Sequence, residues 1–410
     1  MRVQWRRMLE IPGPVLTRPF WFMAALAALG ILLSVLREFT GLRAVTALND
    51  GYSWGLFKNF NVTTLTALGS GGYALALLTY VCNQGKYHSL LRTGLLTSIL
   101  TYTAGMIALS VDIGRPWNLF FMADPWVWNP HSILWEVAFC MTAYVMIALD
   151  FENLAPLLER LEDQHMPKLV RDLAGYAKRF VKTAYPYGVA LALALPTMHQ
   201  SSLGSLMLLG GPRVHPLWQT HLLPLLYVVM AFILGIAFVE LVLMASCAVW
   251  LRPIDRSLLA SLSNIVSWTT AAWLMIRFGD LAFRGQLGAA FRFDFYSAIF
   301  LVETVMISLP AMMLRSRELR EAPERAFPAL AVLTLGGMLY RYTPTTIAFL
   351  PGAGYHYFPS VAELLISMGF IALAMTGYLF TVKRFAILPA TLEMSVLAAA
   401  TKSTRKGIAA

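Results

Sequence analysis

Two stretches of the sequence hold most of the side chains that could carry chemistry. Residues 112–136 read DIGRPWNLFFMADPWVWNPHSILWE, and residues 198–205 read MHQSSLGS. They supply carboxyl, guanidinium, imidazole, amide and hydroxyl groups at the ends of long apolar runs. Polar groups are costly beside lipid, so they mark functional candidates by default. An imidazole titrates near neutral pH, which suits proton exchange with a ligand.

The first stretch begins with two opposite charges at the end of an apolar run. Asp112 and Arg115 are three residues apart, so a helix places them on one face as an ion pair. Gly114 and Pro116 end that helix. The pair is either a structural closure of the helix end or a wall of a binding cavity. In the cavity, Asp112 is a candidate catalytic carboxyl and Arg115 a candidate ligand-binding residue.

The same stretch then places an imidazole and a carboxyl at the start of the next apolar run. Asn129 and Pro130 are typical of a helix N-cap and first helical position. Glu136 then lies roughly 8–10 Å below the outer helix end, at about 1.5 Å per residue. A carboxylate at that depth must pair, take up a proton or meet water. We therefore predict a catalytic role for Glu136 and a ligand-binding role for His131.

The second stretch follows a proline inside an apolar run. Pro196 removes one helical hydrogen bond and kinks the helix. His199 and Ser202 share a helix face, with Gln200 beside them. These groups suit a pocket for a carbonyl-bearing ligand, with His199 as the catalytic candidate and Gln200 and Ser202 as binding residues. The alternative for His199 is a packing histidine whose hydrogen bonds are satisfied.

Three isolated acids lie in later apolar runs, at Glu240, Glu303 and Glu363. Together they could form a proton path through the second half of the chain. Packing or partner-binding roles are the alternative, because each acid taken alone is weak evidence.

Transmembrane helices are the elements that would position these groups. Of the 410 residues, 58% are hydrophobic and 13% are charged, whereas roughly a quarter are charged in a typical soluble domain. Runs of about 20 apolar residues suit a bilayer crossing, so we predict an all-α integral membrane protein. The ten expected spans are residues 20–37, 60–82, 92–112, 131–150, 183–208, 221–250, 257–277, 294–314, 327–349 and 361–382.

Lys and Arg are distributed unevenly between the two sides of these spans. If both termini share a side, that side carries 23 of the 32 basic residues and the other carries 9. This bias places both termini in the cytoplasm. We expect a cytoplasmic N-terminal tail (1–19), a ten-helix membrane domain (20–384) and a cytoplasmic C-terminal tail (385–410). The polar motifs then fall at the outer ends of the helices, where we expect the active pocket.

Charge and cysteine content exclude other classes of protein. The net charge of +10 reflects this topology, so we expect no nucleic-acid partner. Cys82, Cys140 and Cys247 lie far apart, so we expect no metal site, iron–sulfur cluster or disulfide framework. The first span has no convincing cleavage site and is interpreted as retained.

Several motifs together resemble one family of membrane proteins. HQSSLGSL (199–206) followed by HPLWQ (215–219) is the most specific signal, and NDGYSWGLF (49–57), DIGR (112–115) and RFG (277–279) agree with it. On these motifs the chain resembles the NrfD/PsrC superfamily. Within that superfamily it is most similar to the HybB branch, the membrane subunits of periplasmic nickel–iron hydrogenases. The resemblance covers almost the whole chain.

The resemblance implies a subunit that binds no haem or iron–sulfur cluster itself. Such a subunit exchanges electrons between a quinone (menaquinone or ubiquinone) and an extracytoplasmic ferredoxin-like iron–sulfur subunit. That partner links to a catalytic subunit, with a nickel–iron hydrogenase favoured over a molybdoenzyme or a cytochrome-linked complex. The implied location is the bacterial cytoplasmic (inner) membrane, with the functional face toward the periplasm. The quinone pocket is expected among the spans within 60–208, fed from membrane lipid.

On this interpretation, His199 donates a hydrogen bond to a quinone carbonyl. Asp112 orients the His199 imidazole or returns a proton to it. His131 and Glu136 form the opposite wall or the proton route. Competing interpretations are a haem b protein, a secondary transporter and a structural anchor. Bis-histidine haem ligation needs two facing intramembrane histidines, and His131 and His199 are the only ones near spans. No internal repeat supports the transporter.

Overall fold

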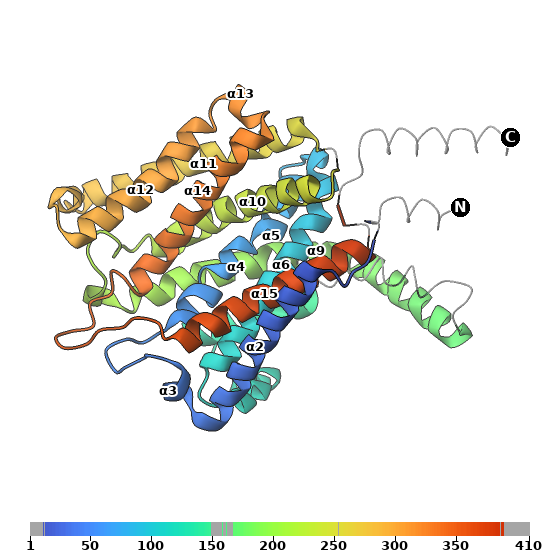
Figure 1. Cartoon of the computed structure of the whole chain (residues 1–410), viewed down its shortest axis with the longest axis horizontal. Coiled ribbons are helices and arrows are strands. Elements are labelled where there is room, and N and C mark those ends of the chain that lie inside the picture. Colours follow the sequence, from blue (N-terminus) through green and yellow to red (C-terminus); the bar gives the residue numbers. More distant parts are fainter. Residues whose placement is uncertain are drawn as a thin grey trace.

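The described chain is built from helices (Figure 1). The computed structural model describes residues 11, 13–148, 158, 161, 167–252, 254–385, 387 and 388. Among these residues no strand forms beyond an isolated bridge between Val214 and Phe349, which joins two loops. The predicted all-α class is therefore confirmed for the part of the chain that the structure describes.

Seven helical segments of the described chain are long and apolar enough to cross a membrane. The protein is therefore a multi-pass membrane protein. The seven segments are α2 (Arg18–Thr40), the broken helix Phe57–Val81, Gly85–Asp112 (which contains α6, Leu91–Asp112), α10 (Leu223–Val249), α11 (Arg256–Phe283), α12 (Phe295–Met313) and α15 (Val361–Arg384). Three other expected spans coincide with helices outside this set: Ile133–Met146 (which contains α7, Ile133–Ala143), α9 (Lys168–Leu208) and α14 (Pro323–Tyr342). A total of ten spans, and the side on which each terminus lies, stay predictions.

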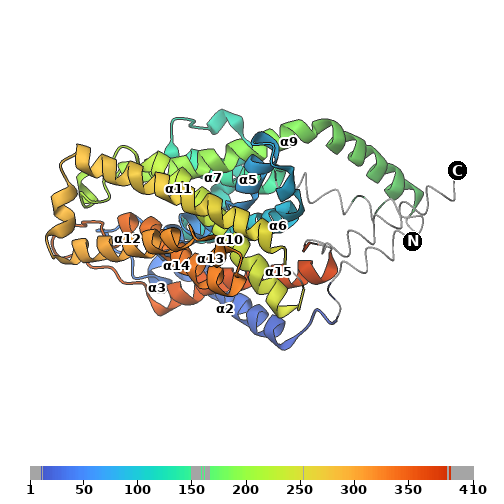
Figure 2. The same ribbon diagram turned by 90° about the horizontal axis from the view of Figure 1, so that it is seen from above.

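Helix α10 lies in the centre of the bundle (Figures 1 and 2). It packs against α9, α11 and α14 and against the broken helix of residues 57–81. The broken helix runs as η1 (Phe57–Val62), α4 (Leu65–Leu68), α5 (Gly71–Ala76) and η2 (Leu77–Val81), and η1 and η2 are π-helical. Glycine permits its close packing, because a Cβ on Gly71 would lie 2.7 Å from the Gly235 carbonyl oxygen.

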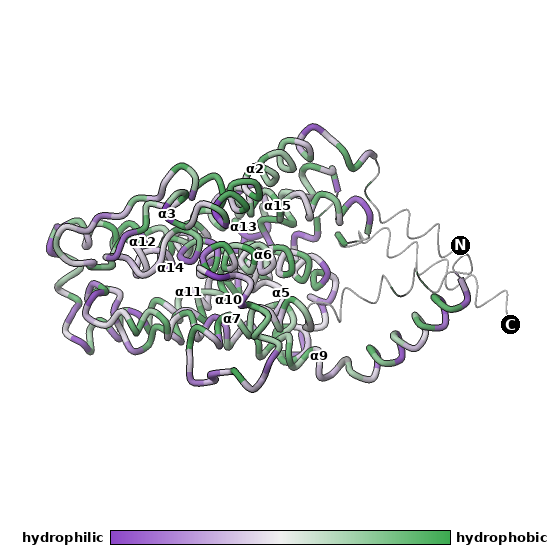
Figure 3. The backbone as a smooth tube through the Cα atoms, turned by 90° about the horizontal axis from the view of Figure 1, so that it is seen from below, coloured by the Kyte–Doolittle hydropathy of each residue, from purple (hydrophilic) through white to green (hydrophobic). Residues whose placement is uncertain are grey.

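Helices α2 and α15 form an antiparallel pair at one edge of the bundle (Figure 1). Gly30 and Gly369 meet there, since a Cβ on Gly30 would lie 2.7 Å from the Gly369 Cα. The Lys383 ammonium donates to the Pro14 carbonyl, which ties the end of α15 to the start of α2. Figure 3 shows hydrophobic residues along most helices, as a bundle in lipid requires.

Short helices occupy the connections between the long ones. They are α3 (Leu42–Val45), η3 (Gly85–Leu90), η4 (Pro116–Ala123), η5 (Pro125–Val127), η6 (Tyr144–Ala148), η7 (Gly211–Arg213), η8 (Leu287–Phe291), α13 (Arg317–Arg320) and η9 (Thr343–Thr345). Helix α9 extends beyond the end of the bundle (Figures 1 and 2), because its 41 residues span about 60 Å, twice the bilayer core.

Candidate functional site

His199 lies near the C-terminal end of α9, and its side chain is fully buried. Its Nδ1 lies 3.1 Å from the Val137 carbonyl oxygen of α7, and its Nε2 lies 3.4 Å from the Thr66 hydroxyl of α4. The ring also packs against Tyr102 of α6, with ring centroids 5.4 Å apart. Three neighbouring elements therefore surround the imidazole.

The Gln200 amide connects the same groups to the second half of the chain. Its Nε2 donates to the Thr66 hydroxyl at 3.2 Å and to the Tyr102 hydroxyl at 3.1 Å. Its Oε1 accepts a 2.6 Å hydrogen bond from Nη2 of Arg341 on α14. Because Arg341 can only donate, this contact fixes which way the amide points. We call His199, Gln200, Thr66, Tyr102 and Arg341 the central network.

Arg341 is fully buried, and the ion pairs among the described residues do not include it. Its guanidinium also donates to the carbonyl oxygens of Thr63 (2.6 Å) and Tyr227 (2.9 Å), and it lies 4.3 Å from the Tyr227 ring centroid. Hydrogen bonds and a cation–π contact therefore replace a carboxylate partner.

The hydrogen bonds assign the hydrogens of the central network. A carbonyl oxygen only accepts, so the Val137 contact places a hydrogen on His199 Nδ1. The Thr66 hydroxyl donates to the Val62 carbonyl at 2.5 Å, so its hydrogen is not available to His199. In the neutral imidazole, Nε2 then keeps a lone pair that can accept a proton. The Tyr102 hydroxyl accepts from Gln200, and the Ser70 side chain is its second hydrogen-bond partner.

Arg341, Tyr102 and Asn61 were not singled out from the sequence. Both polar atoms of the Asn61 amide are buried with no hydrogen-bond partner among the described residues. Asn61 lies five residues before Thr66, in the π-helical η1, and such turns are frequent at functional sites. For Arg341 a signal was present, since an arginine inside an apolar span is expected to have a function. No comparable signal marked Tyr102 or Asn61.

The expected partnership between Asp112 and His199 is absent from the structure. Asp112 ends α6, ten residues and about 15 Å along the helix from Tyr102. It is half-buried and within electrostatic range of Lys58 and Arg37. Arg115 is exposed, and no ion pair joins it to Asp112 among the described pairs. The helix ends at Asp112, so the two residues do not share a helix face.

The helix that carries Glu136 begins later than expected. Ser132, rather than Asn129, is the N-cap, and its hydroxyl accepts from the Trp135 backbone N–H. Glu136 therefore lies in the first turn of α7, not two turns below the helix end. It is half-buried and adjacent to Val137, whose carbonyl holds His199, whereas His131 lies exposed in the preceding turn.

The remaining candidates lie apart from one another. Ser202 is buried and its hydroxyl donates to Met198 of its own helix at 2.8 Å. Glu240 accepts from Ser263 of α11 at 2.5 Å. Glu303 pairs with Arg277 of α11 at 2.6 Å. Ser263 and Arg277 are fourteen residues, or about 21 Å, apart along α11, so Glu240 and Glu303 do not meet.

Glu363 is buried at the start of α15 as part of a capping box with Ser360. Its carboxylate accepts from the backbone N–H groups of Ala47 (3.0 Å) and Ser360 (2.9 Å) and from the Tyr357 hydroxyl (2.7 Å). Burial raises the pKa of Tyr357. These contacts give Glu363 a structural role in joining the loops at this end of the bundle.

The fold and the site define a polytopic helical membrane protein with a buried polar centre shared by both halves of the chain. The family described as "Polysulphide reductase, NrfD" matches residues 44–345, a range that contains the whole central network. The chain belongs to this family, which confirms the resemblance drawn from its motifs.

Relatives extend the match beyond that range. The chain is 38% identical over 385 residues to the "Probable Ni/Fe-hydrogenase 2 b-type cytochrome subunit" of Escherichia coli (strain K12), covering 92% of this chain and 94% of the relative. It is 30% identical over 173 residues to the "Menaquinone reductase, integral membrane subunit" of Nitratidesulfovibrio vulgaris, covering 42% and 39%. It is 23% identical over 239 residues to a selenate reductase subunit of Mesobacillus selenatarsenatis, covering 53% and 54%.

The name of the E. coli relative includes a b-type cytochrome, which would need haem ligands. Among the described histidines, His199 is the one buried within a long helix, and its ring nitrogens face Val137 and Thr66. The others lie in loops or short helices: His88, His131, His215, His221 and His356. His165 lies outside the described residues. Two facing imidazoles are needed, so the described histidines do not fit a haem b.

Proposed function

We propose that this protein is the quinone-reactive membrane subunit of a respiratory oxidoreductase complex. It exchanges electrons between menaquinone or ubiquinone and an extracytoplasmic ferredoxin-like iron–sulfur subunit. The favoured catalytic subunit is a nickel–iron hydrogenase, because the relative matched over 92% of the chain is named a Ni/Fe-hydrogenase subunit. The name of the menaquinone reductase relative supports the quinone role, and the selenate reductase relative supports a place beside a different catalytic subunit as the alternative.

The central network is the observation that carries this proposal. Reduction of a quinone to a quinol takes two electrons and two protons, so its site needs hydrogen-bond donors and a group that exchanges protons. His199 Nε2 offers a lone pair that can accept a proton, and the Tyr102 hydroxyl is a second polar group of the same network. Gln200 is held in one orientation by Arg341. The unpartnered Asn61 amide adds a donor and an acceptor nearby.

The other candidate residues receive roles that follow from their positions. Glu136 lies next to the carbonyl that holds His199 and is half-buried, so it suits proton transfer between the network and the bundle end. Asp112, Arg115 and His131 lie toward that same end, where the first stretch connects α6 to α7, and suit the mouth of the site. Ser202 lies three residues after His199 on α9, and a quinone-binding role for it is part of the proposal.

The proposed setting is the bacterial cytoplasmic membrane, with the functional face toward the periplasm and with quinone supplied from the surrounding lipid. The uneven distribution of Lys and Arg supports this orientation. A proton path through the second half of the chain would use Glu240, Glu303 and Glu363. Because these carboxylates do not touch one another, such a path needs water between them.

The test is quinone-linked turnover in the intact complex. We expect the substitution His199→Ala to abolish turnover while the subunit still co-purifies with its iron–sulfur and catalytic partners. Thr197→Ala is the matched control. Among the described residues the Thr197 hydroxyl bonds to Leu193 of its own helix and not to the central network, so turnover should persist. Parental turnover in His199→Ala would refute the proposed site and favour a structural anchor.

A further inference from the structure

A second buried polar centre lies between α11 and α12. Arg277 forms a 2.6 Å ion pair with Glu303, and the side chains are 3% and 0% exposed. The Trp218 indole N–H donates to the other carboxylate oxygen at 3.1 Å. The guanidinium lies over the rings of Phe300 (4.5 Å) and Tyr340 (4.9 Å). Neither charge takes part in the central network.

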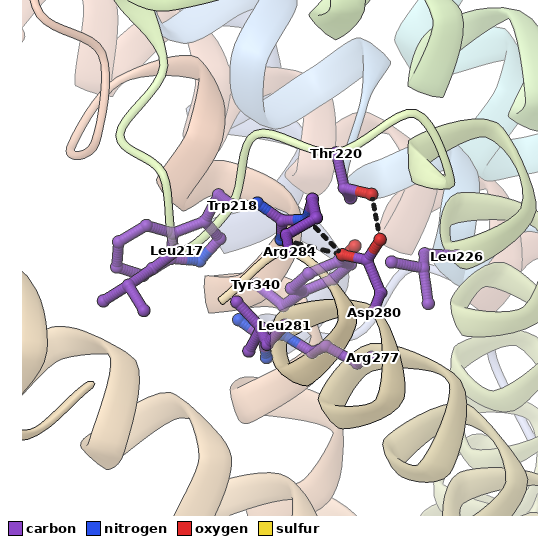
Figure 4. A pocket seen from close by; sticks show the side chains of 9 residues that line it. All are labelled: Leu217, Trp218, Thr220, Leu226, Arg277, Asp280, Leu281, Arg284 and Tyr340. Atoms are coloured by element: carbon purple, nitrogen blue, oxygen red, sulfur yellow. Dashed lines mark hydrogen bonds and ion pairs between the residues drawn. The ribbon is translucent and has the colours of Figure 1, made fainter. Parts of the chain in front are cut away.

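A small cavity adjoins the Arg277 side of this ion pair (Figure 4). Its free space is about that of one water molecule. The polar residues that line it are Trp218, Thr220, Arg277, Asp280, Arg284 and Tyr340. Figure 4 shows these side chains gathered between α11 and the loop before α10.

Two buried groups that line the cavity have no hydrogen-bond partner among the described residues. They are Nη2 of Arg277 and the hydroxyl of Tyr340, a residue only 1% exposed. A buried donor without a partner is costly, and native proteins satisfy most such groups with protein atoms or ordered water. A polar cavity of this size, with several polar neighbours, is the kind that holds a water molecule.

Polar side chains lead from the Arg277 side of the cavity toward the end of the bundle. Arg277, Asp280 and Arg284 lie at positions i, i+3 and i+7 at the end of α11, so they follow one helix face. Their side chains become more exposed in that order, at 3%, 10% and 23%. Asp280 is held by Arg284 at 2.8 Å and by the Thr220 hydroxyl at 2.9 Å. These residues form a polar strip from the buried pair to the bundle end.

We propose that this cavity is a built water site and the inner end of a hydrated route through which Glu303 exchanges protons with the solution at the Arg284 end of α11. The water accepts a hydrogen bond from Arg277 Nη2 and shares another with the Tyr340 hydroxyl. Glu303 does not itself line the cavity, so its carboxylate takes a proton from this water past the Arg277 side chain with which it pairs. The proton that the water gives up is replaced from solution along Asp280. The proton route deepens the proposed quinone chemistry and rests on it, whereas the water site stands without it.

The water site is tested by hydroxyl-radical footprinting of the intact complex in ¹⁸O-labelled water. We expect Trp218 and Tyr340 to incorporate label faster than Tyr102, an equally buried tyrosine whose hydroxyl is bonded to Gln200. In Tyr340→Phe, which keeps the ring and removes the hydroxyl, labelling of Trp218 should fall to the level of Tyr102. Labelling of Trp218 and Tyr340 no faster than that of Tyr102 in the parent protein would overturn the water site.

The proton route is tested in the same Tyr340→Phe complex by its quinone-linked turnover in H₂O and D₂O. We expect slower turnover and a larger solvent isotope effect, with an unchanged KM for quinone because Tyr340 lies outside the central network. Unchanged turnover and isotope effect overturn the route alone. Failure of the quinone site is recognised separately, since it appears as parental turnover in His199→Ala.

Discussion

Replacement of Arg341 by methionine tests the central network most directly. Methionine keeps an unbranched, flexible side chain in the core but removes all of the guanidinium donors. Three acceptors lose a hydrogen bond: the Thr63 carbonyl, the Tyr227 carbonyl and Gln200 Oε1. Gln200 loses most, because its orientation depends on this contact.

The expected loss of stability follows from these contacts. A hydrogen bond to a charged group contributes about 1.5–3 kcal/mol, and a buried acceptor left unpaired costs about 1–3 kcal/mol. Removing a buried charge offsets part of this loss, because its desolvation penalty disappears. We therefore expect Arg341→Met to lower the free energy of unfolding by about 3 kcal/mol. Arg341→Lys should lose less, since it keeps the charge but cannot reach three acceptors at once.

Denaturant-induced unfolding of the purified protein in detergent measures this change, with quinone-linked turnover measured in parallel. Arg325→Met is the matched control, because Arg325 is exposed on the same helix and its loss should change stability by no more than about 0.5 kcal/mol. If Arg341→Met were as stable as this control, the network would contribute nothing to stability and the reasoning would be wrong.

Three other predictions follow from the packing, a loop histidine and the haem argument. Gly369→Leu should destabilise the protein by about 1–3 kcal/mol, because a Cβ at this position would lie 2.6 Å from the Gly30 Cα. The control Gly279→Ala should leave stability unchanged, because a Cβ there has nothing within 4 Å. Thermal unfolding of the two variants measures the difference. Burial lowers the pKa of His215 below 6.5, so the folded state resists protonation and thermal stability should fall as pH drops through about 6.5; His215→Asn should remove this dependence. A reduced-minus-oxidised spectrum of the purified subunit should lack a b-type band.

Hydrophobicity predicted the helices well, because each long apolar run has to be helical in lipid. The sequence also singled out His199 and Gln200, since polar residues in apolar runs are conspicuous; it placed them at the outer end of a helix, and the structure shows both side chains fully buried. Helix ends were harder to predict: Asn129 and Ser132 are both good N-caps, and the structure uses Ser132. That shift of three residues moved Glu136 to the first turn of α7.

Contacts between distant segments could not be predicted, because helical periodicity says nothing about which helices are neighbours. Asp112 was paired with His199 since both were expected at outer ends, yet the contacts of His199 come from Thr66, Val137 and Tyr102. Arg341 lies 141 residues from the glutamine it holds. A single sequence carries no record of such a contact.

The position of Arg341 shows how the two halves of the chain depend on each other. It belongs to α14 in the second half, but two of its three hydrogen bonds go to Thr63 and Gln200 in the first half. Misplacing α14 by one residue would turn the guanidinium by about 100° and leave a buried charge without acceptors. The cost of that error makes the register of α14 specific, and it makes the orientation of Gln200 a property of the assembled bundle. A quinone bound beside His199 would therefore meet a site that exists only when both halves are in place.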